Sequence, residues 1–268
     1  MPGISLSIER LKYDELNLGR LKLESSPSGN GQSINLLELT SPFLFLRGNG
    51  QWQKDSTHLR GRASSDQVSA LLRSFGFNVN NFVAGHGFLD FNLAWEGSLF
   101  TPNVQSLSGN ARLDLGAGRI VEVGQASGAK MDIARLLSIF SLQALPRRLA
   151  LDFSDVAQRG YAFDSLKGDF TLRQGNATTQ NLRFEGTLAR VDISGRIGLS
   201  RKDVDLRLNV VPHVSSTLPV AATLMAGTPV VGIAAMAVNT MLSSQVSRAA
   251  TYSYTVRGSW SNPVWGSR

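Results

Sequence analysis

An alternation of apolar and polar residues between positions 149 and 210 constrains the fold of this chain more than any other feature. Within each short segment, apolar side chains occupy every second position, and polar or charged side chains lie between them. Successive side chains of a strand point to opposite faces, so the pattern predicts strands with one apolar and one solvated face. The predicted apolar face comprises Leu166, Phe170, Leu172, Leu182, Phe184, Val191, Ile193, Ile197, Leu199, Val204, Leu206 and Leu208.

Short turns separate these segments, at Gln174–Asn176 and Ser200–Asp203. Tight turns between alternating segments are typical of antiparallel hairpins. A loose unit of strand, turn and strand, with a glycine near each strand end, recurs without a fixed length. The chain is therefore predicted to be mainly β, as an elongated antiparallel array with few helices.

Residues 1–130 predict further strands and one short helix. Apolar residues at helical spacing predict a helix over Ser64–Phe75, with Ser64 and Gln67 as its capping box. Glycines at 116 and 118 predict a hairpin over Ser108–Val123. A second helix is expected at 132–144, and a last strand at Thr251–Trp260.

The run Leu208–Ser247 contains no Asp, Glu, Lys or Arg. Prolines and glycines interrupt it, which favours two short apolar helices over one straight span. The longer one, Val230–Ser244, would reach about 22 Å, short of a hydrocarbon core of about 30 Å. We expect shallow insertion into a membrane or closure of the sheet's end; a helical hairpin packed as ordinary core is the alternative. The predicted membrane contacts are Leu218, Val220, Leu224, Met225, Val230, Val231, Ile233, Met236, Met241, Arg248 and Arg257.

The net charge of +7 is concentrated near this apolar run. No acid follows Asp205, whereas four arginines do. Basic residues beside apolar surface suit an anionic membrane, although they could also keep an apolar tail soluble. Cysteine is absent, which excludes disulfides, a thiol nucleophile and a cysteine-ligated zinc site.

No pattern in the sequence predicts catalysis, a metal or a cofactor. The histidines His58, His86 and His213 lie in unrelated contexts, and neither a phosphate-binding loop nor a nucleophile elbow occurs. Asp152 and Asp155 are expected to solvate a turn. Basic residues are not interleaved with stacking aromatics, so no nucleic-acid partner is expected.

The segment Ala134–Ala222 resembles the C-terminal region of the YhdP branch of the AsmA-like proteins. The pieces that carry the resemblance are Leu142–Leu149, Leu151–Val156, Phe163–Leu172 and Ile193–Leu199 running to Val211-Pro212-His213. The terminal YSYTVRGSWSNPVW is similar to the last strand of that family.

This resemblance implies a long protein of the Gram-negative envelope, anchored in the inner membrane and extending across the periplasm as a groove of β-strands. The family is associated with moving phospholipid toward the outer membrane, so the chain would form the distal end of such a bridge. Alternation alone favours a sandwich of two sheets, but the resemblance favours a curled, open groove that binds acyl chains.

We therefore expect three parts: a β-groove segment at 1–130, an AsmA-like β segment at 131–212, and an apolar helical pair with a final strand at 213–268. The expected partners are phospholipid acyl chains, the inner leaflet of the outer membrane and an envelope protein. The competing hypothesis, from another functional class, is an assembly factor that binds a partner protein and carries no lipid. The chain opens without a signal peptide, as a cytosolic protein or an excised end would.

Overall fold

One long antiparallel sheet makes up most of what the computed structural model describes, namely residues 2–13, 16–75, 79, 82–120, 161–187, 189–213 and 252–267. Its first nine strands are β1 (Ile4–Tyr13), β2 (Leu16–Ser28), β3 (Gly31–Thr40), β4 (Phe45–Trp52), β5 (Ser56–Ser65), β6 (Phe82–Ala84), β7 (Gly87–Glu96), β8 (Ser108–Leu115) and β9 (Gly118–Ile120). The remaining six are β10 (Tyr161–Arg173), β11 (Asn176–Gly186), β12 (Ala189–Gly198), β13 (Asp203–Pro212), β14 (Tyr252–Ser259) and β15 (Asn262–Ser267). Helix α1 (Val68–Ser74) lies between β5 and β6.

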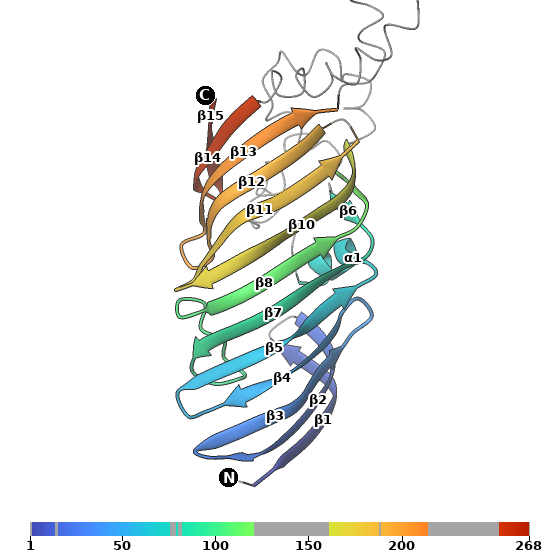
Figure 1. Cartoon of the computed structure of the whole chain (residues 1–268). Coiled ribbons are helices and arrows are strands. Elements are labelled where there is room, and N and C mark those ends of the chain that lie inside the picture. Colours follow the sequence, from blue (N-terminus) through green and yellow to red (C-terminus); the bar gives the residue numbers. More distant parts are fainter. Residues whose placement is uncertain are drawn as a thin grey trace, which may run out of the picture.

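Neighbours in the sequence are mostly neighbours in the sheet, which is therefore elongated and open. The order runs from β1 through β5 to β7, β8 and then β10 to β15, while β6 and β9 pair beside this path. Strands β1 and β15 lie at opposite ends of the long axis (Figure 1). The prediction of a mainly β, antiparallel, open array is confirmed.

The two faces of the sheet differ as the alternation predicts. Along β11, buried side chains alternate with exposed ones until a bulge interrupts the period. On the polar face, ion pairs join neighbouring strands, for example Arg183 to Asp192 and Arg257 to Asp205. One face is thus apolar, and the other carries cross-strand charge pairs that remain in water.

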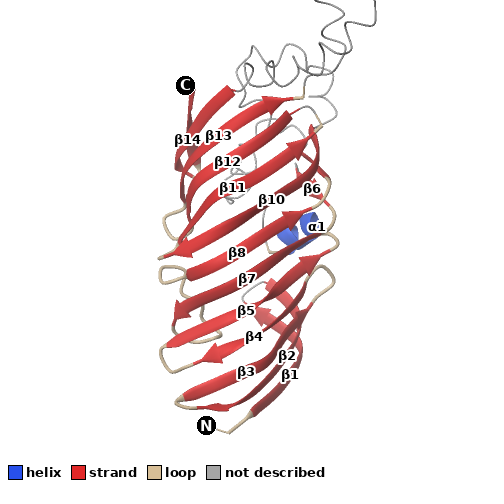
Figure 2. Ribbon diagram, in the orientation of Figure 1, coloured by secondary structure: helices blue, strands red, loops and turns tan. Residues whose placement is uncertain are grey.

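Helix α1 begins later than the sequence predicts. Ser64 belongs to β5, the helix starts at Val68, and its N-cap residue Gln67 makes no side-chain capping bond. The Ser65 hydroxyl instead accepts a hydrogen bond from the Gln67 N–H. The proposed capping box is therefore wrong, because Ser64 still belongs to the strand and Gln67 is itself the N-cap residue. Helix α1 lies on the far side of the sheet in Figure 2.

The expected hairpin over Ser108–Val123 is also wrong. Strand β8 pairs with β7 and β10, whereas β9 pairs with β6 and β10. The chain therefore bends at Gly116 without reversing, and the β6–β7 segment bends beside it. The Gly116 N–H donates to the His86 carbonyl over 3.1 Å. A Cβ on Gly116 would lie 2.1 Å from the His86 ring, so only glycine fits there.

Two six-strand units share the same local features. The first unit comprises β2, β3, β4, β5, β7 and β8, and the second comprises β10 to β15. The second strand of each unit carries a bulge: Asn35 and Leu36 face Asn49, and Gln180 and Asn181 face Ser194. The glycine that follows each facing residue, Gly50 or Gly195, has a backbone carbonyl where a Cβ would lie.

The turns that follow β7 and β14, the fifth strands of the two units, have similar sequences and geometry. The first reads Gly97-Ser98-Leu99-Phe100-Thr101-Pro102 and the second Gly258-Ser259-Trp260-Ser261-Asn262-Pro263. Gly97 and Gly258 have φ angles of 105° and 107°. The Gly97 N–H bonds to the Asp55 carbonyl, and the Trp260 N–H bonds to the Lys202 carbonyl. Each turn is thus hydrogen-bonded to a second turn of its own unit, between β4 and β5 in the first unit and between β12 and β13 in the second.

Some expectations lie outside the described residues. These are the helix at 132–144 and the apolar helical pair within 214–251. The predicted last strand is present as β14, and β15 follows it as a strand that the sequence did not predict.

Candidate functional site

The apolar face of the sheet carries two separate clusters of buried side chains. The first apolar cluster draws on the first unit and consists of Leu23, Ile34, Leu59, Trp95 and Leu99. The second apolar cluster draws mainly on β10 to β14 and includes Ile193, Val204, Leu206, Tyr254 and Val256. Together they form the candidate site, because a one-sided apolar face must be covered by something other than water.

The second apolar cluster contains almost all of the residues that the alternation assigns to the apolar face. Seven of them are buried members, and Phe170, Val191, Ile197 and Leu199 pack against it from partly buried positions. Leu172 is buried but belongs to neither cluster. Gly168 lies between Leu166 and Phe170, and a Cβ on it would meet the Leu182 Cα at 2.7 Å.

A cover formed by α1, β6 and β9 lies over the apolar face beside this cluster, and the sequence did not predict it. Ser69 of α1, which is buried, donates to the Phe82 carbonyl over 2.8 Å and accepts from the Ala84 N–H over 2.7 Å. The Val68 N–H bonds to the Gly85 carbonyl. These bonds fasten the helix to β6, so helix and strand form one unit.

An aromatic row ties the cover to the sheet. The rings of Phe82 and Phe163 stack with centroids 5.8 Å apart, and Phe163 contacts Phe184 at 5.2 Å. Gly118 of β9 lies beneath the Phe163 ring, where a Cβ would come within 2.4 Å of it. Phe163 and Phe184 lie within the alternating segment, but Phe82 lies outside it, so the periodicity gives no signal that the three rings form a row.

The predicted membrane contacts lie outside the described residues, apart from Arg257. Arg257 is on the polar face of β14 and pairs with Asp205 at 2.9 Å. Its nearest described partner is therefore a carboxylate of the neighbouring strand. Within the described parts of the chain, no helix is long and apolar enough to cross a membrane.

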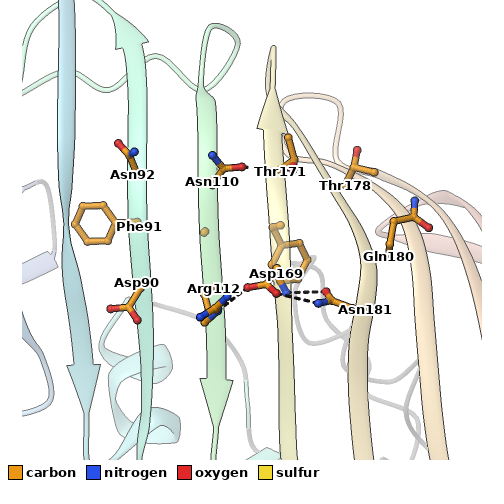
Figure 3. A pocket seen from close by; sticks show the side chains of 12 residues that line it. Asp90, Phe91, Asn92, Asn110, Arg112, Asp169, Thr171, Thr178, Gln180 and Asn181 are labelled. Carbon is orange, nitrogen blue, oxygen red and sulfur yellow. Dashed lines mark hydrogen bonds and ion pairs between the residues drawn. The ribbon is translucent and has the colours of Figure 1, made fainter.

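In the described part of the chain, a shallow hollow lies on the polar face at the bulge of each unit. The larger, of about 660 Å³, spans β7, β8, β10 and β11 and includes the bulge residues Gln180 and Asn181 (Figure 3). Its groups bind one another: Arg112 contacts Asp169 at 2.6 Å, and the Asn181 amide donates to Asp169 over 2.8 Å. The side-chain Oδ1 of Asn181 also accepts a hydrogen bond from the Asp169 backbone N–H. This bond replaces a backbone hydrogen bond that the bulge interrupts.

Neighbouring arginines keep two carboxylates of this face ionised. A hydrogen bond from Arg112 holds the pKa of Asp169 below its ordinary range, and Arg62 does the same to the pKa of Asp90. Carboxylates with lowered pKa stay ionised near neutral pH and are weak bases. Among the described residues, no three of the types that bind metals lie close enough together to hold an ion.

Comparison with known proteins shows which family the chain belongs to. It is 27% identical over 250 residues to a protein of Escherichia coli (strain K12) named intermembrane phospholipid transporter YhdP, a match that covers 91% of this chain and 19% of that protein. The chain therefore spans about a fifth of the length of this relative. No solved structure matches it. The family model of the YhdP protein matches residues 1–265, and the chain belongs to that family.

Proposed function

We propose that the chain is a segment of a non-enzymatic phospholipid conduit, in which acyl chains travel along the apolar face of the open sheet. The observation that supports this most directly is the apolar face, which runs across both units while the opposite face is lined with charge pairs. The related E. coli protein is named for phospholipid transport between membranes. An apolar sheet face gains roughly 25 cal/mol for each Å² that acyl chains remove from water.

In this proposal the conduit lies in the periplasm of a Gram-negative bacterium, within a longer protein anchored in the inner membrane. The segment forms the end that reaches the inner leaflet of the outer membrane. The support for this placement is the uncharged run Leu208–Ser247 with the arginines that follow it. Arginine beside apolar residues favours contact with anionic lipid head groups.

The direct test is organic extraction of the purified chain followed by mass spectrometry. We expect phospholipid in near-stoichiometric amounts, whereas an assembly factor that binds only protein would yield a lipid-free chain. A soluble protein without a lipid-binding cavity, treated identically with the same cell extract, reports lipid that adheres nonspecifically.

A second test places a charge in the proposed path within the full-length protein. Ile193→Asp and Leu206→Arg should interrupt lipid passage, because an unpaired charge among apolar groups costs several kcal/mol. Val191→Asp, at a partly buried position of β12, repeats the test with less risk to folding. Ser194→Asp adds the same charge on the polar face of β12 and should leave transport unchanged. Undiminished transport in a folded Val191→Asp protein would contradict the conduit.

The membrane placement has its own test in flotation with anionic liposomes. The intact chain should float, and a chain lacking Thr217–Ser244 should not, while both retain their β-sheet signal in circular dichroism. Equal flotation of the two chains would contradict membrane binding by this segment, but it would not contradict the conduit.

A further inference from the structure

The apolar face is divided in two, and the division follows the two units. The buried members of the first apolar cluster come from β2, β3, β5, β7 and the turn after β7. Those of the second come from β10 to β14, the turn after β14 and the cover. The equivalent turn residues Leu99 and Trp260 each belong to the cluster of their own unit. Each unit therefore supplies the buried core of one compartment, while Leu113 and Leu115 of β8 pack against the second cluster from partly buried positions.

The cover stands at the junction of the two compartments. A Cβ on Gly87 of β7 would lie 3.1 Å from Val68 of α1 and 2.4 Å from Leu115 of β8, so the helix rests on the apolar side of these strands. Strands β7 and β8 end the first unit, and β10 begins the second. Val68, Phe82 and Ile120 are buried members of the second cluster, so the cover belongs to the second compartment and lies next to strands of the first.

Each compartment is longer than one lipid tail but shorter than two tails placed end to end. Six strands spaced by about 4.8 Å span about 24 Å along the sheet. Half of a hydrocarbon core of about 30 Å, which one acyl chain fills, is about 15 Å. One unit can accommodate an acyl chain lying along the sheet axis, but it is too short for two placed end to end.

We propose that the two compartments bind phospholipid separately, one molecule each, and that the cover formed by α1, β6 and β9 keeps the two lipids apart. This proposal rests on the proposed function and adds that lipid moves in steps from one site to the next. The polar head groups project past the edges of the strands into water, because the apolar face offers them no partner.

The structure supplies a matched pair of positions for the test. Trp52 of β4 and Ile197 of β12 both lie two residues after the equivalent glycines Gly50 and Gly195. Both are partly buried, and each packs against the cluster of its own unit. Asn49 and Ser194, which face the two bulges on the polar side, provide equivalent control positions.

The experiment loads the whole 268-residue chain from vesicles of phosphatidylethanolamine and phosphatidylglycerol and counts bound lipids by native mass spectrometry. We expect two lipids on the unchanged chain, one on Trp52→Asp, one on Ile197→Asp and none on the double variant. Asn49→Asp and Ser194→Asp should retain two. Circular dichroism and thermal unfolding confirm that each variant is folded.

Loss of both lipids in a folded single variant would overturn the division, because it would indicate one continuous file of lipid. A broad distribution of lipid numbers on the unchanged chain would do the same. Absence of lipid from every protein, including the unchanged one, would instead contradict the proposed function. The two failures are therefore distinguishable.

A second measurement needs no substitution. The unchanged chain is loaded with a phospholipid that carries a photoreactive group on its acyl chain, and the crosslinked peptides are mapped. Crosslinks should fall in both clusters and avoid Ser69 and Ala84, which lie inside the cover. Uniform labelling through the cover would contradict its role as a partition.

Discussion

The two units share strand order, bulges and turns, yet their apolar faces are covered to different degrees. In the first unit Trp52, Phe91 and Leu93 remain partly exposed at the border of the cluster. In the second, Val256 is 0% exposed and Ile193 is 1% exposed. The first cluster has five buried members and the second has seventeen, so one backbone plan can carry a small or a large buried apolar cluster, depending on what packs against it.

The polar residues buried at equivalent positions also differ between the units. In the first unit, Gln32 donates a hydrogen bond to the Pro2 carbonyl, and Thr57 donates one to the Gly97 carbonyl. When the two units are aligned by their bulges and turns, these positions are Ala177 and Val204 in the second unit, both buried. The second unit in turn buries Thr179 where the first has Ile34, so each face buries a polar group at a position where the other is apolar.

The largest difference between the units should appear when a charge enters each face. Val256→Asp should lower the free energy of unfolding by about 4 kcal/mol or more, because the carboxylate would be fully buried without a partner. Phe91→Asp, at a partly exposed position of the first unit, should cost about 1–2 kcal/mol, because water still reaches it. Urea denaturation followed by circular dichroism measures both. Equal losses would show that the two faces are covered alike.

The cover should contribute the next largest effect. Phe163→Ala removes the central ring of the aromatic row, and we expect a loss of about 3 kcal/mol from the cavity left under Phe82. Trp52→Ala removes a larger side chain but should cost about 1–2 kcal/mol, because that ring is partly in water. Thermal unfolding compares the two. A larger loss for Trp52→Ala would mean that the cover is not what closes the second face.

The equivalence of the units can be tested at their turns. Gly97→Ala and Gly258→Ala each place a Cβ at a φ near 105°, which should cost about 1–2 kcal/mol. Gly258→Ala should cost slightly more, because its Cβ would lie 3.1 Å from the Asn262 carbonyl, whereas the closest atom at Gly97 is 3.8 Å away. Denaturation midpoints provide the measurement. A negligible effect at one site alone would break the equivalence.

The alternation in the sequence predicts most of the sheet because each strand exposes one face to water. That is why the apolar residues on β10 to β13 could be assigned to one face by position alone. The cover could not be predicted, because it depends on two bends in the chain, at Gly85–His86 and at Gly116–Ala117. The glycines at 116 and 118 predicted a hairpin at the second of these bends. A glycine allows both a turn and a bend, and only the pairing of the neighbouring strands decides between them.

The two-unit plan was not detected in the sequence for a different reason. The connection between the fourth and fifth strands comprises residues 66–86 in the first unit but 213–251 in the second. Matching features therefore do not recur at a constant spacing, and the residues on each face differ although their hydrophobicity is similar. The positive φ of Gly97 and Gly258 and the two bulges reveal the plan, since they mark backbone geometry directly.

The smallest expected effect concerns a charge pair that only the second unit has. Arg196 binds Asp203 through two hydrogen bonds of 2.7 and 3.0 Å, where the first unit has Gln51 and Ser56. This bond from Arg196 lowers the pKa of Asp203. Asp203→Ser, which copies the first unit, should cost about 0.5–1 kcal/mol near neutral pH, as partly exposed ion pairs do.

The contribution of Asp203 to stability should depend on pH, and the lowered pKa gives the direction of this dependence. A carboxylate whose pKa is lowered by folding stabilises the folded state above its unfolded pKa of about 3.9, and the stabilisation is lost as the pH falls through the folded value. The difference between the unchanged chain and Asp203→Ser should therefore be constant from pH 6 to 8 and shrink below about pH 4. Thermal unfolding across this range provides the measurement, and Ser56→Asp in the first unit is the matched control. Because Gln51 offers no positive charge, Ser56→Asp should add no stability at neutral pH. A gain as large as the loss at Asp203 would show that the carboxylate alone, without Arg196, stabilises this turn.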